Sequence, residues 1–180
     1  MESVKTIEKK AYEAMKGEFG YKNLLASPHL VKIAVSSGTG RSMKANKNFN
    51  QHVADRLAKI TGQKPSVRGA KKSIASFKVR AGDPVGLMVT LRGERMYSFL
   101  DKFINIALPR TKDFRGISKG AVDAIGNMTI GIREHTIFPE TGDEDIRDVF
   151  GLAITIVTTA KSKQEAIKFF ELLGIPFKKD

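Results

Sequence analysis

The amino-acid sequence predicts an α+β fold: a mostly antiparallel sheet of about five strands, with helices packed on one face and long functional loops. Two observations support it. Segments with apolar residues at helical spacing are interspersed with short segments of period two, in the order helix, strand, helix, two or three strands, helix, two strands, helix. Repeats, low-complexity tracts and linkers are absent from the sequence, so residues 1–180 are expected to form a single domain.

Four segments have an apolar face at helical spacing, which predicts amphipathic helices. Their apolar residues are Val4, Ile7, Ala11, Met15 and Phe19, then Phe49, Val53, Leu57 and Ile60, then Met96, Phe99, Leu100, Phe103 and Ile106, and finally Ala166, Phe169, Phe170 and Leu173. The residues expected to end these helices are Gly20, Gly62, Pro109 and Gly174. Ser162 and Glu165 form a capping box, in which each side chain satisfies the other residue's amide.

Alternating apolar residues predict strands around 31–36, 87–91 and 128–132, and residues 152–157 form the strongest strand of the chain. A turn at 82–86 precedes the second of these. One face of the sheet packs against helices, which leaves the other face free. Polar and basic residues on a free sheet face are typical of a platform for RNA. The candidates are Lys32, Ser36, Thr90, Arg92, Arg133, Thr155 and Thr158.

The chain is strongly basic, which favours a polyanionic partner. Thirty-one Lys and Arg against nineteen Asp and Glu give a net charge of +12. Residues 41–95 contain thirteen basic and three acidic residues, so this segment alone carries +10. Such a concentration of charge indicates a patch that binds nucleic acid. A membrane is disfavoured, because no predicted helix combines a basic face with a strongly apolar one. Lysines scattered for solubility are the alternative interpretation.

Composition excludes several classes of protein. The sequence has no cysteine, which excludes disulfide scaffolds, thiolate zinc sites and cysteine nucleophiles. No stretch approaches the ~20 apolar residues that span a bilayer. The N-terminus lacks the apolar block of a signal peptide. A soluble, cytoplasmic protein is expected.

The basic stretch 68–80 is the best candidate for contacts with RNA. Its cations flank small residues, so ammonium and backbone groups can approach phosphates closely. Arg68, Lys78 and Arg80 therefore join the candidate rRNA contacts. Phe77 is interpreted as a core residue, with stacking on a base as the alternative.

The sequence predicts no catalytic residues, no metal site and no cofactor. His29, His52 and His135 lack metal-ligand spacing and are expected to be surface or RNA-contacting side chains. The turn 38–41 lacks the further glycine and lysine of nucleotide-binding loops, although its amides can contact an RNA phosphate. The acidic run 140–148 does not follow the order of an EF-hand. It is either a solvated loop or a contact for a basic protein, and residues 110–127 form a second long loop.

Nine short runs resemble the bacterial large-subunit ribosomal protein five family, in order and along essentially the whole chain. They are Gly-Gln-Lys-Pro at 62–65, Ala-Lys-Lys-Ser at 70–73, Phe-Lys-Val-Arg at 77–80, Val-Thr-Leu-Arg-Gly-Glu-Arg-Met at 89–96, Pro-Arg at 109–110, Asp-Phe-Arg-Gly at 113–116, Gly-Asn at 126–127, Phe-Pro-Glu at 138–140 and Ile-Thr-Ile-Val-Thr-Thr-Ala-Lys at 154–161. After the first strand the family usually carries an asparagine and a turn similar to Met-Gly-Val-Gly, whereas this chain has Ser-Ser-Gly-Thr-Gly at 36–40, including Ser36 and Ser37. Serine still donates to phosphate or ribose, so both residues remain expected rRNA contacts.

The resemblance implies a non-enzymatic constituent of the large ribosomal subunit, present as a monomer within the cytoplasmic ribosome. The implied partners are 5S rRNA, which it helps attach to the central protuberance, large-subunit rRNA and neighbouring large-subunit proteins, with no membrane. The loop at 70–77 would contact the transfer RNA in the P site through Ala70, Lys71, Lys72, Ser73 and Ser76. The loops at 110–127 and 140–148 would face a basic small-subunit protein across an intersubunit bridge, through Arg110, Asp113, Arg115, Asp143, Glu144 and Asp145.

These observations predict that the protein binds RNA by neutralising phosphates and by recognising the shape of folded RNA. The main rRNA contacts are expected from Lys32, Lys78, Arg80 and Arg92. A general RNA chaperone and an RNA-processing factor are the alternatives. The chaperone would bind unrelated RNAs as tightly as 5S rRNA, and a processing enzyme would need a convergent acidic or histidine site.

Overall fold

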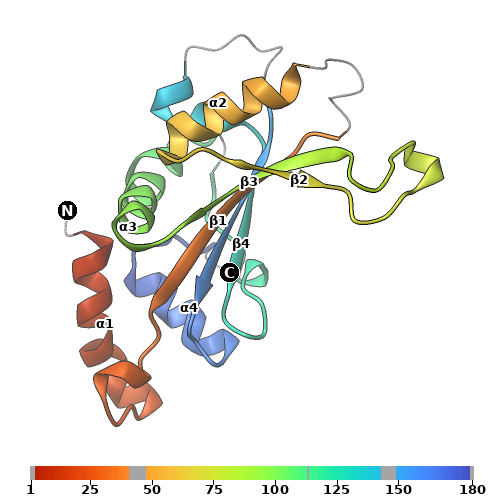
Figure 1. Cartoon of the computed structure of the whole chain (residues 1–180). Helices are drawn as coiled ribbons and strands as arrows, with labels where there is room; N and C mark the ends of the chain where they lie inside the picture. Colours follow the sequence, from red (N-terminus) through yellow and green to blue (C-terminus); the bar gives the residue numbers. More distant parts are fainter. Residues whose placement is uncertain (1–2, 41–47, 113, 143–148, 179–180) are drawn as a thin grey trace. The chain divides into compact units, whose positions relative to one another are not determined.

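The computed structural model describes residues 3–40, 48–112, 114–142 and 149–178 (Figure 1). In these ranges the elements are α1 (Val4–Phe19), β1 (Leu30–Gly38), α2 (Phe49–Thr61), β2 (Ser66–Gly69), β3 (Pro84–Leu91), α3 (Gly93–Lys102), β4 (Met128–Ile132), β5 (Leu152–Thr158) and α4 (Lys163–Leu172). The strands form an antiparallel sheet in the order β2-β3-β1-β5-β4. The α+β fold class and the order of elements expected from the sequence are confirmed. No helix in these ranges is long and apolar enough to cross a membrane.

The chain divides into two compact units. The first unit consists of Met1–Ile33, Leu91–Ile130 and Ile154–Asp180, and the second of Ala34–Thr90 and Gly131–Ala153. The first unit therefore contains α1, α3 and α4, and the second contains α2. Unit boundaries fall inside β1, β3, β4 and β5. The expectation of a single domain over residues 1–180 stays a prediction.

Alternating burial distinguishes the covered and open faces of the strands in the first unit. The covered side chains of β4 and β5 include Met128, Ile130, Ile154 and Ile156. On the open face the hydroxyl oxygens of Thr129 and Thr155 lie 3.1 Å apart. Thr158 is buried, and its hydroxyl donates to the carbonyl of Gly126 at 2.7 Å. The expectation that Thr158 shares a face with Thr155 is wrong, because residues three apart in a strand point to opposite faces.

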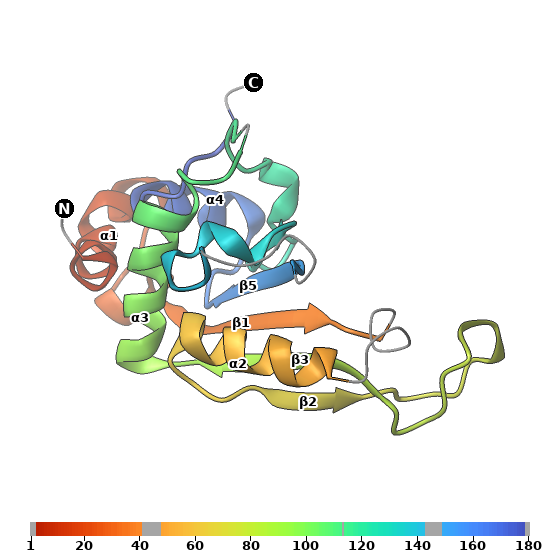
Figure 2. The ribbon, with the colours of Figure 1, turned by 90° about the horizontal axis from the view of Figure 1, so that it is seen from above.

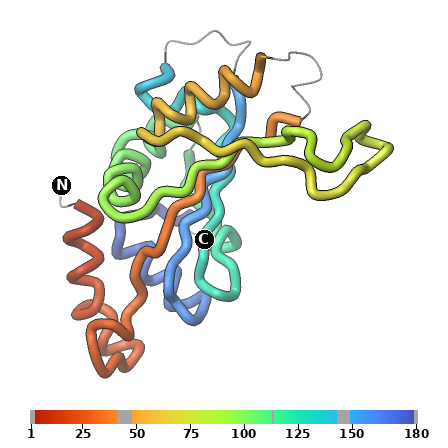
Figure 3. Tube along the Cα trace, in the orientation of Figure 1, coloured from red at the N-terminus to blue at the C-terminus, as the bar shows by residue number. Residues whose placement is uncertain are grey.

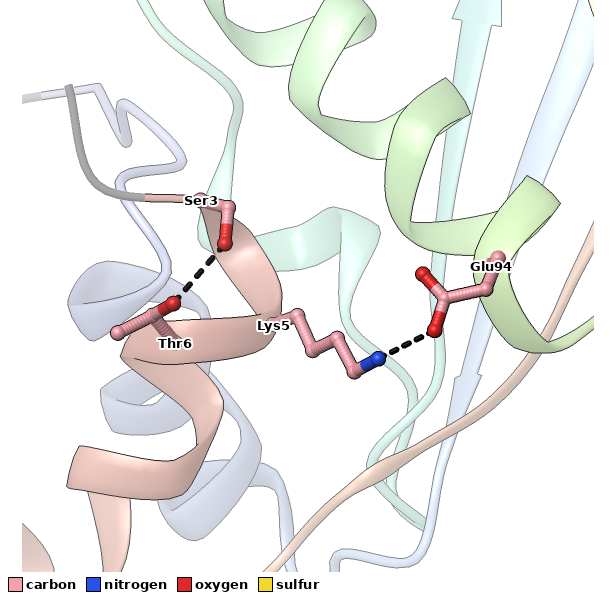
Figure 4. Close-up of polar contacts among 4 residues, drawn as sticks. All are labelled: Ser3, Lys5, Thr6 and Glu94. Carbon is pink, nitrogen blue, oxygen red and sulfur yellow. Dashed lines mark hydrogen bonds and ion pairs between the residues drawn. The ribbon is translucent and has the colours of Figure 1, made fainter.

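In the first unit, α1 lies against both α3 and α4 (Figure 2). The amide of Val4 donates to the carboxylate of Asp101 at 2.8 Å, so α3 supplies a cap for the beginning of α1. Lys5 of α1 forms an ion pair with Glu94 at the other end of α3 (Figure 4). The two contacts hold the first turn of α1 at two points.

The beginning of α4 confirms half of the expected capping box. The Ser162 hydroxyl accepts a hydrogen bond from the Glu165 amide at 3.3 Å, as expected. The Glu165 carboxylate accepts from the Lys161 amide at 2.6 Å and from the Tyr21 hydroxyl at 2.5 Å. The expectation that it returns to the Ser162 amide is wrong, because the donors to this buried carboxylate are the Lys161 amide and the hydroxyl of Tyr21, which follows α1.

A π-helical turn at Phe103–Ala107 continues α3. The amide of Leu108 donates to the carbonyl of Phe103, five residues back, at 2.9 Å. This wider turn rotates the side chains that follow, so that Ala107 and Leu108 are buried and Ile106 is 44% exposed. The expectation that Ile106 continues the apolar face of a regular helix is wrong for this reason.

In the second unit, β3 begins earlier than the sequence suggested. Only Gly82, with a φ of 92°, adopts a left-handed turn conformation in the stretch 82–86. Pro84 is the first residue of β3, where its missing amide leaves no gap in the ladder. Gly86 lies within the strand, and a Cβ there would be 2.9 Å from the carbonyl oxygen of Ser37. The close approach of β1 and β3 therefore requires a glycine at position 86.

Replacing Gly126 with alanine is expected to lower the free energy of unfolding by about 1–3 kcal/mol. Gly126 has a φ of 87°, and its added Cβ would lie 2.7 Å from the Cβ of Ala160. Urea unfolding followed by circular dichroism measures the loss. The matched control is Gly17→Ala in α1, where the methyl group meets nothing within 4 Å. This control is expected to gain about 0.5–1 kcal/mol, and losses of equal size in both variants would contradict the prediction.

Stability is expected to fall at alkaline pH through Tyr21. Burial, and then the hydrogen bond to Glu165, raises the pKa of the Tyr21 hydroxyl above its usual 10.0. Because the folded-state pKa is raised, this stabilisation is complete below pH 10 and is lost as the pH rises through the folded-state value. Tyr21→Phe should therefore show a smaller fall in unfolding free energy above about pH 10. Urea titrations at several pH values measure the fall, and equal falls in both proteins would rule out this role.

Candidate nucleic-acid interface

Residues 70–83, called here the finger, connect β2 to β3 and extend beyond the ends of both strands (Figure 1, Figure 3). Two backbone hydrogen bonds close its base. The Ala70 amide donates to the Asp83 carbonyl at 2.8 Å, and the Gly82 amide donates to the Ala70 carbonyl at 2.9 Å. The finger therefore continues the pairing of the hairpin after the strands themselves have ended.

The tip of the finger is a short 3-10 helix, Ala75–Phe77. Ile74 and Val79 pair across it, with amide-to-carbonyl distances of 2.9 and 3.3 Å. Lys78 adopts a left-handed conformation with a φ of 51°, which reverses the chain after the 3-10 helix. The backbone of the tip is thus fixed by its own hydrogen bonds.

Four cations of the finger are exposed: Lys71, Lys72, Lys78 and Arg80. In the described part of the chain none of them has an ion-pair partner. The carboxylate of Asp83 accepts a hydrogen bond from the backbone amide of Arg80 at 2.7 Å. The one acidic side chain of the finger thus contributes to the fold of its base, and the four cations remain available for phosphates.

The structure brings all the expected transfer RNA contacts together in the finger. Lys71, Lys72 and Ser76 are exposed, and Ala70 is half-buried. Ser73 is exposed too, but its hydroxyl accepts a hydrogen bond from the Ala81 amide at 2.9 Å. Ser73 therefore helps to fold the finger, and its hydroxyl proton can still be donated to an RNA oxygen.

Phe77 is exposed, although the sequence was interpreted as placing it in the core. Its side chain is 65% exposed, so the interpretation as a core residue is wrong. Phe77 belongs to the 3-10 helix at the tip of the finger, which extends beyond the ends of β2 and β3, so the core of its own unit does not cover the ring. The signal in the sequence was the lack of any apolar periodicity on either side of Phe77, where Ser76 and Lys78 flank it.

The remaining rRNA candidates of the second unit differ in accessibility. Arg68 on β2 and Arg133 after β4 are exposed, and Ser36 and Thr90 are half-buried. Ser37 is only 5% exposed, and its hydroxyl donates to the carbonyl of Gly151 at 2.8 Å. An rRNA contact by the Ser37 side chain stays a prediction, and the burial of this side chain argues against it.

Three rRNA candidates of the first unit have accessible side chains. Lys32 and Thr155 lie on strands, where Thr155 is half-buried, and Arg92 is exposed at the beginning of α3. Thr158 is buried and its hydroxyl is bound to Gly126, as described above. Of the rRNA contacts expected in the first unit, Lys32, Arg92 and Thr155 therefore have accessible side chains.

The segment 110–127 is anchored at several points. Ile117 is buried and bridges to Phe177, and the Asp123 carboxylate accepts from the amides of Ile125 and Asn127 at 3.1 and 2.7 Å. Arg110 and Arg115 are exposed. The other expected contacts across the bridge lie outside the described residues: Asp113, Asp143, Glu144 and Asp145.

Histidine and carboxylate side chains do not gather into a metal site among the described residues. His135 is fully buried, its ring stacks on Phe150 with centroids 4.0 Å apart, and its Nδ1 accepts from the Phe150 amide at 3.3 Å. The expectation of a surface or RNA-contacting role is therefore wrong for His135, which packs in the core of the second unit. His52 is half-buried and His29 is exposed.

Two family models match the chain. The model described as ribosomal protein L5 matches residues 23–80, and the model of the C-terminus of the same ribosomal protein family matches residues 84–177. The two matches follow one another along the chain and include residues 70–80 of the finger and all five strands.

Curated relatives match over nearly the full length. The large ribosomal subunit protein uL5 of Thermotoga maritima is 49% identical over 172 residues, which cover 96% of this chain and 93% of the relative. The protein of the same name from Natranaerobius thermophilus is 51% identical over 163 residues, covering 91% and 90%. That from Desulfatibacillum aliphaticivorans is 52% identical over 162 residues, covering 90% of both chains. This chain belongs to the family of ribosomal protein L5 of the large subunit.

Proposed function

We propose that the protein binds 5S rRNA and helps to attach it to the central protuberance. Membership of the family makes it a structural, non-enzymatic constituent of the large subunit in the cytoplasmic ribosome. The observation that carries the proposal is the charge, because residues 41–95 hold +10 of the total +12. In a ribosomal subunit the polyanion that complements such a segment is RNA.

Exposed cations supply the electrostatic part of this binding. Arg68, Lys78 and Arg80 of the second unit and Arg92 of the first all have accessible side chains. Phosphate contacts of this kind position a protein on RNA without reading its sequence. The open-face hydroxyls, such as that of Thr155, add donors and acceptors for ribose 2′-hydroxyls. The combination supports recognition of a folded RNA by shape.

We further propose that the finger contacts the transfer RNA in the P site. Its four accessible cations and its hydrogen-bonded backbone support this role. Little conformational entropy is lost when such a segment binds a polyanion, because its backbone is already ordered. Exposed Arg110 and Arg115, together with the acidic residues 143–145, would contact a basic small-subunit protein across an intersubunit bridge. Large-subunit rRNA and neighbouring large-subunit proteins complete the partners of a protein that acts as a monomer within the ribosome.

Preference for 5S rRNA is expected to survive physiological salt. Purified protein is titrated with matched 5S rRNA and with a scrambled RNA of equal length, at salt concentrations from about 50 to 200 mM. Phosphate contacts weaken for both RNAs as salt rises, whereas shape-dependent contacts remain for 5S rRNA. If the two RNAs bind alike at every salt concentration, the protein is a general RNA chaperone and the proposal fails.

Reversing the charge of Lys71 and Lys72 to glutamate is expected to weaken P-site transfer RNA on the order of tenfold at low salt. Binding to free 5S rRNA should change little, because other cations supply those contacts. The matched control reverses Lys9 and Lys10, two adjacent exposed lysines on α1. Ribosomes reconstituted with each variant are assayed for transfer RNA affinity. Equal loss of 5S rRNA and transfer RNA binding would refute the division of labour.

A further inference from the structure

We infer that Phe77 and Ile74 form an apolar tip that stacks on an exposed nucleobase of a folded RNA. The inference rests on the proposed function, since the finger must first reach an RNA. Phe77 is 65% exposed and Ile74 is 46% exposed, on a segment whose other exposed side chains are small or cationic apart from Asp83, whose carboxylate accepts from the Arg80 amide. Two large apolar side chains at the end of an extended hairpin are unfavourable in water, which indicates a partner that covers them.

The fold of the finger is carried by hydrogen bonds of its backbone. Pairing of Ile74 with Val79 and the hydrogen bond from the Ala81 amide to Ser73 hold the tip, and the Phe77 ring stays largely exposed beside them. The amide of Lys78 donates to the carbonyl of Ala75 at 3.0 Å and closes the turn that carries the ring. The backbone therefore presents Phe77 at a defined place while most of its surface remains accessible.

The charge around the tip selects a nucleobase as the occupant. Lys71, Lys72, Lys78 and Arg80 surround Phe77 in sequence and have no ion-pair partners among the described residues. A nucleotide offers a flat π face for the ring and a phosphate for a neighbouring cation at the same time. An apolar protein surface would cover the ring but leave the four cations beside it without counter-charges.

The backbone geometry also favours binding by reducing its entropic cost. Lys78 already has the left-handed φ of 51° that the tight turn requires. The backbone bonds across the tip join residues of the finger itself, and a phenylalanine has only two side-chain torsions to fix. Stacking energy gained at the tip is thus available for affinity.

Two contributions to binding are expected, and salt separates them. Phosphate contacts release counterions, so each contributes to the slope of log affinity against log salt. Stacking of Phe77 releases no ions, so its contribution is the same factor at every salt concentration. If the tip contacted only phosphates, the salt slope would depend on the lysines, and removing the Phe77 ring would not lower affinity.

Ribosomes carrying Phe77→Ala test the inference through their affinity for P-site transfer RNA across a salt series. We expect affinity to fall between about fivefold and about a hundredfold, by the same factor at each salt concentration. Lys71→Ala with Lys72→Ala should instead reduce the salt slope, by up to about 0.9 per lysine. Phe77→Tyr keeps a ring and should restore affinity. Val67→Ala removes an equally accessible apolar side chain from β2 and should have no effect.

A fluorescence measurement with the free protein distinguishes the two sources of the base. The chain contains no tryptophan, so Phe77→Trp introduces a single indole at the tip. Titration with 5S rRNA should leave its emission unchanged if the base belongs to transfer RNA. Strong quenching, absent in the control Val67→Trp, would assign the base to 5S rRNA, and stacking would still hold.

The outcomes separate this inference from the proposed function. If Phe77→Ala leaves transfer RNA and 5S rRNA affinities unchanged while the lysine variant weakens binding, stacking is refuted and the proposed function stands. If neither variant changes any affinity, the inference and the proposed contact of the finger with transfer RNA both fail, while the proposed binding of 5S rRNA through other cations stands. If Phe77→Ala changes the salt slope, the ring acts by arranging the lysines, and stacking is again refuted. Circular dichroism and thermal unfolding, expected to match the unchanged protein, exclude loss of fold.

Discussion

Side-chain alternation along the strands is the constraint on which the rest of the structure depends. It assigns each polar residue either to the covered face or to the open one, and a shift of one residue reverses that assignment. Ser36 and Ser37 illustrate the consequence, because the second is buried and bonded to Gly151 while the first remains accessible. Thr155 and Thr158 divide in the same way. Within one strand, a buried hydroxyl thus bonds to the neighbouring backbone, while a hydroxyl on the open face remains accessible.

The finger holds its backbone in place and exposes polar side chains without a core of its own. Its backbone groups pair across the hairpin, and the side chains of Ser73 and Asp83 bond to backbone amides. Because these bonds are local, the cations are not needed to hold the finger together. Their side chains remain accessible on a backbone that is already shaped. Backbone groups and two polar side chains therefore hold the finger in shape, while its cations are available to contact a partner.

Local patterns in the sequence were enough to predict the elements and much of the candidate site. Helical spacing located the four helices, and Gly20 and Gly62 end the first two in left-handed conformations, because capping depends on neighbouring residues alone. Burial of His135 and the partners of Glu165 depend on residues far along the chain, which spacing cannot reveal. The exposure of Phe77 was not predicted either, since it follows from the position of the ring at the tip of a hairpin that extends beyond its strands.

Charge explains why an extended segment suits this protein. Like charges within a Debye length of about 8 Å repel at physiological salt, and repulsion inside a compact unit lowers its stability. Four cations on a hairpin that projects beyond its strands are instead surrounded by water. The remaining repulsion is relieved when phosphates approach, so part of the free energy of holding the charges together is recovered on binding RNA. Neutral backbone hydrogen bonds suit such a segment, because they hold its shape equally well before and after the counter-charge arrives.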